Sequence, residues 1–471
     1  MNKQECAIKY VEDNYLQFNR LRHDIIADKL QVRCAHPIGD RLEAKGERQE
    51  QWREMTKHDI NSIVCHAAQE YDANITSREV MTALQSDLIP DVHPLREYIL
   101  SLQPYTPDQP DWIDLVAQKV TVKPSLLSDD RPKGLLDRTS CCETTCSTPK
   151  SHELFQGPRT LRDRTEGAER PMESLSEACE RSKADRLWRG CFKKWFVAMV
   201  ASWMKDEVVN HQVLVLIGKQ GIFKTTWLEH LIPPHLRAYA CKLANSNDLN
   251  KDERLRIAEF GLISLDEIDS MNNRELNQLK SVITATDVNE RAAYAYTKER
   301  RVRLASFCAS GNRRDFLTDI TGNRRWLPFE VESIQNPFTT ILPYERMYAQ
   351  AWALAQDPLF SYWFDLEEIE VLEQHNQYFR DESNEEQLLP ILFDVPAEGR
   401  GEFMTTAQIS ERLVTYGNIK KPMALSRLGM VLGAAGYRST RPKIGGRLIR
   451  GWLVYQRDTD EVASLRRLLK E

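Results

Sequence analysis

Cysteine is scarce in this sequence, and its scarcity excludes one class of fold. Ten cysteines among 471 residues are too few for a scaffold held together by disulfide bonds. Cys141, Cys142 and Cys146 lie close together, but no Cys-x-x-Cys or close His pair follows them at the spacing of a zinc site. We therefore expect free thiols in a loop rather than a metal centre.

Long hydrophobic runs are also missing. The first sixteen residues, MNKQECAIKYVEDNYL, mix charged and apolar side chains and lack the apolar centre of a secretory signal. The apolar stretch over residues 195–204 ends at Lys205 and Asp206 and is too short to span a bilayer. These features predict a soluble, cytoplasmic protein without a membrane partner.

An excess of one charge sign is absent too. The chain carries 64 Lys and Arg against 69 Asp and Glu, a net charge of −5, which excludes a uniformly basic nucleic-acid coat. Two segments within this chain carry net charges of opposite sign. Residues 365–398 hold eleven acidic residues and one basic residue, whereas residues 401–471 hold thirteen basic and six acidic residues. Net charge therefore conceals a basic C-terminal segment that is a candidate for nucleic-acid binding.

The spacing of apolar residues divides the chain, whose length alone suggests roughly three domains. A capping-box pattern at residues 56–59 supports helices in the first part. The predicted segments are a helical N-terminal domain (1–122), a flexible linker or insertion (123–183), an α/β domain (184–345), an acidic helical connector (346–400) and a winged-helix-like domain (401–471).

The segment from 184 to 345 is typical of an α/β fold with a mostly parallel sheet. It opens with an amphipathic helix whose Trp188, Trp195 and Trp203 form one apolar stripe, which predicts a core position for all three. Apolar runs at 213–217, 262–265 and 304–309 then predict buried strands separated by helical stretches.

A phosphate-binding loop is predicted after the first of these strands. Residues 218–226 read G-K-Q-G-I-F-K-T-T and lead into a helical stretch, the context that a P-loop requires. The consensus has Gly before the Lys, but this chain has Phe223, so a chance turn after a strand is the alternative. The residues that we assign to nucleotide binding are Gly218, Gly221, Lys224, Thr225 and Thr226.

Polar residues at the ends of the next two strands complete the candidate catalytic set. Asp266 lies 42 residues after Lys224 and is expected, with Thr225, to hold Mg²⁺, while Glu267 would polarise the attacking water. The alternative for this pair is a solvated acidic loop. Asn312 would orient the water.

Arg324 and Arg325 follow on a loop. They fit a finger that reaches the nucleotide of a neighbouring subunit; the alternative is a surface ion-pair site.

These motifs together resemble the virulence-associated E (VapE/VirE-like) family, which is related to superfamily 3 helicases of phages, plasmids and integrative elements. The motifs are G-x-Q-G-x-x-K-T, L-x-x-L-D-E, A-S-G-N and G-N-R-R-W. The resemblance covers residues 185–345 and extends less specifically into the N-terminal part. It implies an AAA+-like ATPase core that uses ATP and Mg²⁺ and usually forms homo-oligomeric rings. It assigns the nucleotide roles to the positions named above.

A basic, aromatic segment lies between the second and third predicted strands. Residues 291–303 carry five basic residues against one acid, with two tyrosines interleaved, a pattern typical of single-strand binding. In superfamily 3 helicases this interval holds a pore hairpin. The alternative is a solvated hairpin whose arginines pair with acids. The candidate DNA contacts here are Arg291, Tyr294, Lys298, Arg300 and Arg301.

The basic C-terminal segment predicts two short helices followed by a Gly-turned hairpin and a strand, which resembles a winged helix. Such a module can meet duplex phosphates, or it can serve protein contacts only. The candidate duplex contacts are Arg427, Arg438, Arg441, Lys443 and Arg447.

Two functions from different classes fit this sequence. The first is an ATP-dependent DNA helicase or translocase that acts in replication or mobilisation of a mobile element. The second is a nucleotide-gated DNA-binding or phage-interference protein without unwinding activity. A third reading, an inactive ATPase scaffold, rests on Phe223 alone. A separately encoded primase is one candidate partner, because relatives often carry a primase signature and none is visible here.

Overall fold

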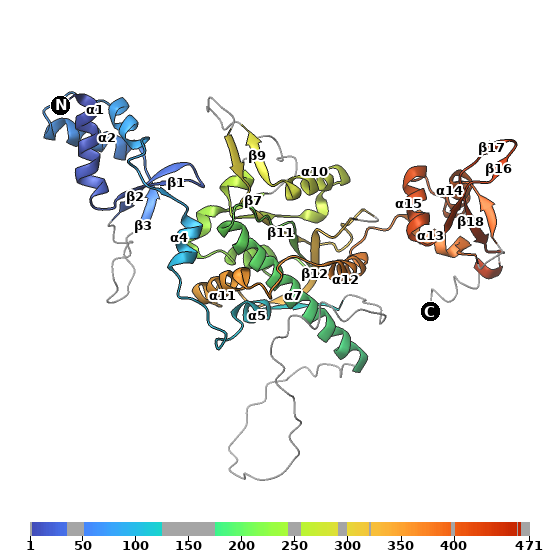
Figure 1. Cartoon of the computed structure of the whole chain (residues 1–471). Coiled ribbons are helices and arrows are strands. Elements are labelled where there is room, and N and C mark those ends of the chain that lie inside the picture. The colour runs from blue at the N-terminus through green and yellow to red at the C-terminus, as the bar shows by residue number, and fades with distance from the viewer. Residues whose placement is uncertain are drawn as a thin grey trace, which may run out of the picture.

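The computed structural model describes residues 2–34, 51–124, 175–243, 256–290, 299–319, 322–396, 401–458 and 460–462. These residues form a mixed α/β protein in which a central body lies between an N-terminal lobe and a C-terminal lobe (Figure 1). The central body contains two clusters of buried apolar side chains, and each lobe contains one. Within the described ranges, no helix combines the length and apolarity needed to cross a membrane.

The N-terminal lobe packs helices against a four-stranded sheet. The helices are α1 (Lys3–Val11), a π-helical turn η1 (Glu12–Leu16), α2 (Lys57–Glu70) and α3 (Ser77–Leu84). The sheet, in the order β3-β2-β1-β4, comprises β1 (Leu21–Asp24), β2 (Lys29–Cys34), β3 (Gln51–Glu54) and β4 (Asp91–Val92). The predicted capping box is present, since Thr56 N–H donates to Asp59 Oδ2 at 2.7 Å.

The prediction of a helical N-terminal domain over residues 1–122 differs from the structure in two respects. It missed the sheet, because these strands are short and polar and their pairing is non-local. It also placed the boundary too late. The helices α4 (Pro94–Ser101) and α5 (Trp112–Ala117) share the apolar cluster of the central body, and β5 (Val120–Val122) pairs with a strand of the central sheet.

A six-stranded sheet organises the central body, in the order β5-β12-β6-β11-β8-β7. The strands after β5 are β6 (Val213–Ile217), β7 (Ala240–Leu243), β8 (Leu262–Leu265), β11 (Ser306–Gly311) and β12 (Trp326–Ile334). All pairings from β12 to β7 are parallel, and only β5 runs antiparallel. The three predicted strands are therefore present, although the third begins at Ser306 rather than Leu304.

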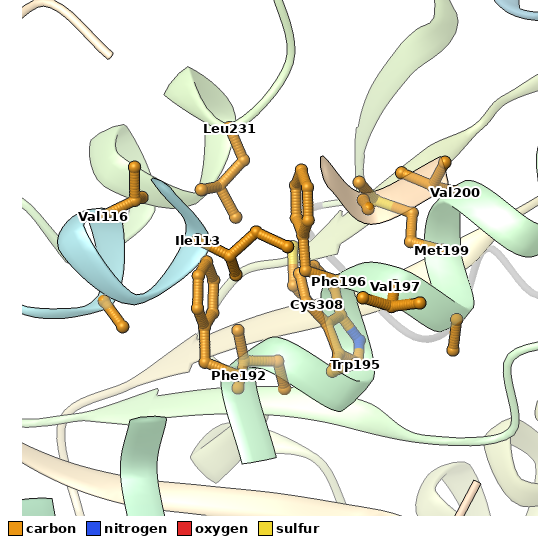
Figure 2. Packing of buried hydrophobic residues seen from close by; sticks show 14 of the residues in the cluster. Ile113, Val116, Phe192, Trp195, Phe196, Val197, Met199, Val200, Leu231 and Cys308 are labelled. Carbon is orange, nitrogen blue, oxygen red and sulfur yellow. The ribbon is translucent and has the colours of Figure 1, made fainter. Parts of the chain in front are cut away.

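The long helix α7 (Leu175–Met204) is the central packing element of this body. Trp188, Trp195 and Trp203 are fully buried, as predicted, and their indole N–H groups donate to Ala117 O, Phe307 O and Gly261 O at 3.0–3.1 Å. Figure 2 shows this helix packed among side chains from α5, the α8 region and β11. Each buried indole donor thus has an acceptor on a different element, which fixes the position of α7.

The remaining elements of the central body surround the sheet. They are α8 (Lys224–His230), η2 (Pro234–Tyr239), η4 (Ile268–Ser270), α10 (Asn273–Thr284), the antiparallel pair β9 (Asp287–Glu290) and β10 (Glu299–Val302), α11 (Tyr344–Gln356) and α12 (Leu366–Gln377).

The acidic stretch that we predicted as a separate connector is divided between two parts of the molecule. Most of α11 and the buried residues of α12 pack on the central body, while α13 (Asn384–Leu392) packs in the C-terminal lobe. Glu367, Glu370 and Glu373 are exposed on α12, whereas Glu368, Glu385 and Glu386 are buried.

Besides α13, the described part of the C-terminal lobe contains two helices and several short strands. They are α14 (Thr406–Gly417), α15 (Leu425–Ala434), β13 (Phe393–Asp394), β14 (Glu402–Met404), β15 (Arg438–Thr440), β16 (Lys443–Ile444), β17 (Arg447–Leu448) and β18 (Gly451–Gln456). β13, β14 and β15 all pair with β18. β16 and β17 form a hairpin around Gly445 and Gly446, whose φ angles of 58° and 80° suit glycine.

Candidate functional site

The loop over residues 218–223 joins the carboxyl end of β6 to the start of α8. Gly218 is required there, because a Cβ atom at this position would lie 2.7 Å from Val331 O. Gly221 has a φ of 86°, which an L side chain adopts only with strain. A side chain at either position would therefore disturb the backbone that joins β6 to α8.

Phe223 occupies the position where the consensus has glycine, and it has adopted the backbone that glycine favours. Its φ and ψ are 67° and 18°, in the left-handed region. Its carbonyl accepts the N–H of Trp227 at 2.8 Å, and its ring meets the edge of Phe338 with centroids 6.3 Å apart. The loop thus keeps its turn in spite of the side chain, at the expense of backbone strain.

The Lys224 side chain is folded back into the loop. Its ammonium donates to Gly218 O and Lys219 O, each at 2.7 Å, and to Asn312 Oδ1 at 3.3 Å. Burial lowers the pKa of Lys224, while the negative charges of Asp269 and Asp266 act in the opposite direction. A buried cation is therefore held at the centre of the loop by neutral acceptors.

Two hydroxyl groups and a carboxylate form a hydrogen-bonded cluster beside this lysine. Ser310 Oγ donates to Asp266 Oδ1 at 2.7 Å, and Thr225 Oγ1 lies 3.2 Å from the same oxygen and 2.9 Å from Ser310 Oγ. The other carboxylate oxygen pairs with Lys242 Nζ at 2.8 Å. Burial would raise the pKa of Asp266, but the hydrogen bonds from Lys242 and Ser310 bring it below its usual value.

Asp269 connects the loops that follow β8 and β11. Its carboxylate accepts the backbone N–H groups of Asn312 and Arg313, both at 3.1 Å, and its side chain is only 9% exposed. It therefore fixes the loop that carries Asn312. Glu267, next to this group, is exposed and has a left-handed backbone with a φ of 52°.

A cavity of about 330 Å³ lies at the carboxyl edge of the parallel sheet. Its lining includes all the predicted nucleotide-binding residues of the loop except Gly218, together with Asp266, Glu267 and Asn312. Ser310, Asp269 and Lys242 complete the polar group, and the sequence reasoning missed them. Two signals pointed to Ser310: its place in the A-S-G-N motif and its place near the carboxyl end of a predicted strand; Asp269 and Lys242 had none.

A larger cavity, of about 780 Å³, lies in the N-terminal lobe. Charged groups at its rim already pair with one another, since His23 contacts Asp28 and Asp91 and Lys29 pairs with Glu54. We favour the smaller cavity as the functional site, because a cation, two hydroxyl groups and a carboxylate converge there beside the 218–223 loop.

Arg324 and Arg325 are not part of this cavity. They directly precede β12, whose first residue Trp326 lies opposite Val213, the first residue of β6. They therefore lie at the amino edge of the sheet, away from the carboxyl edge that carries the loop. Arg324 is exposed, and burial together with the charge of Arg324 lowers the pKa of Arg325.

The basic segment over residues 291–303 is only partly described. Arg291, Tyr294, Lys298 and the side chain of Arg300 lie outside the described residues. Arg301 pairs with Asp28 at 3.0 Å, which links β10 to the N-terminal lobe, and with Glu259 at 3.9 Å. Arg303 is buried and donates to Ala305 O at 3.1 Å and Asn210 O at 2.9 Å. Two of the five basic residues therefore have contacts within the protein. The pairing of Arg301 with acids agrees with the alternative interpretation, a solvated hairpin whose arginines pair with acidic residues.

The C-terminal candidates separate into two groups. Four of them are exposed on or beside the β16–β17 hairpin: Arg438, Arg441, Lys443 and Arg447. Arg427 differs, because its guanidinium donates to Thr318 O at 3.2 Å and lies 3.9 Å from Glu386. Arg427 thus connects α15 to the central body.

The chain was compared with known proteins. No curated protein matches it. One similar solved structure is described as the apo structure of NrS-1 C terminal region (305–718), with 10% identity, 96% of this chain and 100% of that chain covered, and a TM-score of 0.39. A second, the A form apo structure of NrS-1 C terminal region-CTR, has 12% identity, 93% and 98% coverage and a TM-score of 0.38. At such TM-scores neither likeness carries an argument.

A family comparison gives a specific match. Residues 163–385 match the family model of the virulence-associated protein E-like domain. This range contains β6, the 218–223 loop, Asp266, Asn312 and both arginines before β12, and it agrees with the motifs that the sequence presented. The chain therefore carries a virulence-associated protein E-like domain over residues 163–385.

Proposed function

We propose that this chain is an ATP-hydrolysing enzyme with an AAA+-like core related to superfamily 3 helicases. We further propose that it acts on DNA in the replication or mobilisation of a mobile genetic element. One observation carries the proposal: Lys224 and the Thr225–Ser310–Asp266 group converge on a single cavity at the carboxyl edge of a parallel sheet. Ligands of open α/β sheets bind at this edge.

Each residue has a role that follows from its contacts. Lys224 would exchange the carbonyls of Gly218 and Lys219 for the phosphates of ATP, since those acceptors are neutral. Glu267 would polarise the attacking water, and Asn312, whose backbone Asp269 fixes, would orient it. Thr225 and Asp266 would hold Mg²⁺, which would neutralise the charge of the phosphates.

The donor set near Asp266 fits Mg²⁺. Thr225 Oγ1 and Ser310 Oγ both lie within 3.2 Å of Asp266 Oδ1, and all three are hard oxygen ligands. Among the described residues, no three His, Cys, Asp or Glu side chains gather into a metal-binding group. Asp266 and Thr225 would hold Mg²⁺ together with the nucleotide phosphates, a set of ligands that is usual for this ion.

We also propose a homo-oligomeric ring. Because Arg324 and Arg325 lie at the edge of the sheet opposite the cavity, they can serve as fingers only for the nucleotide of a neighbouring subunit. Light scattering with and without ATP would measure the assembly. A protein that stays monomeric at saturating ATP would exclude this role for both arginines.

For DNA, we propose that the C-terminal lobe is a winged-helix-like module that meets duplex phosphates through Arg441, Lys443 and Arg447. The β9–β10 hairpin would contact a single strand. A separate primase remains a candidate partner.

One observation favours a second candidate, a nucleotide-gated DNA-binding or phage-interference protein without unwinding. Arg301 and Arg303 make contacts within the protein, which leaves fewer cations on the hairpin to grip a strand. A strand-displacement assay separates the two. DNA-stimulated ATP hydrolysis without unwinding would favour the second candidate.

Substitution of Lys224 by Ala tests the proposal. Loss of a charged hydrogen-bond donor to phosphate is expected to weaken ATP binding about 10- to 100-fold and to abolish hydrolysis. Lys29→Ala is the control, since it removes a lysine from an exposed ion pair in the N-terminal lobe. Hydrolysis by Lys224→Ala at the rate of the unmodified protein would refute the proposed function.

A further inference from the structure

Lys242 is a cation that no step of the proposed reaction uses, although it lies beside the site. It is on β7, an edge strand of the parallel sheet, where it lies opposite Ser264 of β8. Its Nζ lies 2.8 Å from Asp266 Oδ2, and its side chain is 45% exposed, against 29% for the carboxylate. The lysine is therefore anchored at one end and free to move into solvent.

The carboxylate of Asp266 is shared between two kinds of partner. Its Oδ1 faces the hydroxyl groups of Thr225 and Ser310, which lie on the packed elements α8 and β11. Its Oδ2 faces only the flexible lysine among the contacts described here. A hydrogen bond to Asp266 raises the pKa of Lys242, and the negative charges of Glu229 and Glu267 add to this shift. The ammonium thus sits in the field of three carboxylates.

We propose that Lys242 is a tethered cation that pairs with Asp266 and competes with Mg²⁺ for it. This inference rests on the proposed function. A divalent cation that binds Asp266 must displace the ammonium or bind within a few ångströms of it, and like charges at that distance repel. Lys242 therefore sets the Mg²⁺ concentration at which nucleotide binding becomes effective, and it is a positioning residue rather than a catalytic one.

The proposal predicts that only substitutions that remove the positive charge of Lys242 change the Mg²⁺ requirement. Lys242→Met and Lys242→Gln remove the competing cation, so the Mg²⁺ concentration for half-maximal nucleotide binding should fall about five- to tenfold. Lys242→Arg retains the charge and should stay within about twofold of the unmodified protein. Both uncharged variants keep a long side chain at a half-exposed edge position, which favours correct folding.

The measurement is the binding of a fluorescent, non-hydrolysable ATP analogue by the full chain at fixed pH, titrated with Mg²⁺. Lys29→Met is the matched control, because Lys29 also pairs with a carboxylate at 2.8 Å but lies in the N-terminal lobe. It should leave the Mg²⁺ midpoint unchanged.

The outcomes separate this inference from the proposed function. If the unmodified protein binds no analogue at any Mg²⁺ concentration, the proposed function fails and this inference fails with it. If the analogue binds but the uncharged variants need as much Mg²⁺ as the unmodified protein, or more, only the inference is overturned. A lower midpoint in both uncharged variants, with Lys242→Arg unchanged, would support it.

Discussion

The strain at Phe223 can be measured by comparing two substitutions that remove the same ring. Phe223→Ala and Phe223→Gly both delete the contact with Phe338 and both remove the phenyl ring from the loop. They differ only in the backbone freedom of the residue, whose φ is 67°. The difference between their free energies of unfolding therefore isolates the left-handed conformation.

The magnitude follows from two opposing terms. A left-handed backbone costs an L residue roughly 1–2 kcal/mol, which Ala carries and Gly does not. Gly in turn loses more backbone entropy on folding, which costs it roughly 0.5–1 kcal/mol. We therefore expect Phe223→Gly to be more stable than Phe223→Ala by about 0.5–1 kcal/mol.

A matched pair on α8 gives the opposite sign. Glu229 is exposed in this helix, and there Gly should be less stable than Ala by about 0.5–1 kcal/mol. Urea unfolding followed by tryptophan fluorescence suits both pairs, because buried Trp227 lies on α8 itself and Trp188 contacts it. If Gly were the less stable residue at position 223 by the same amount as at position 229, the strain argument would be refuted.

Two further predictions concern the central body. Lys194 pairs with Glu368 at 2.5 Å, and their side chains are 7% and 3% exposed. Lys194→Met should therefore lower the free energy of unfolding in urea by about 3–5 kcal/mol, and adding Glu368→Gln should restore at least about 2 kcal/mol. If the second substitution restored no stability, an uncompensated buried charge would be excluded as the cause. Burial lowers the pKa of His375 from its usual 6.5 to about 4. Between pH 6.5 and 4 the unfolded chain therefore binds a proton that the folded chain does not. As the pH falls through this range, this group lowers the free energy of unfolding by roughly 1.4 kcal/mol per pH unit. His375→Gln should flatten that slope in unfolding curves at pH 7, 6 and 5, and an unchanged slope would contradict the assignment.

The parts of the fold that could be predicted are those specified by local sequence. The β6 run is continuously apolar, and the two glycines that follow it constrain the chain wherever the rest of the protein lies. The tryptophan stripe of α7 was equally readable, because helical spacing alone separates a buried face from an exposed one. The N-terminal sheet could not be predicted in this way, since β4 has only two residues and pairs with β1 from far along the chain.

The candidate site also contains residues that local sequence predicts and residues that only the pairing of strands brings into place. Lys224 and Asp266 lie in recognisable motifs, whereas Ser310, Asp269 and Lys242 gain their roles only when three strands bring their carboxyl ends together. No local pattern marks Lys242, because a lysine on an edge strand usually faces solvent. What selects it is the parallel order β7-β8-β11, which depends on pairing across the whole domain.

The sequence was least able to predict which basic side chains are exposed and which are buried or paired. Arg303 belongs to a basic run, yet it is buried with its guanidinium among backbone carbonyls near the end of α10, and burial lowers its pKa to about 9. Because Arg301 pairs with Asp28, any DNA contact over residues 291–303 depends on the basic residues before Arg301. On the C-terminal lobe, by contrast, the basic residues of the β16–β17 hairpin are exposed around a glycine turn. That hairpin is therefore the surface on which the structure best supports a proposal of DNA binding.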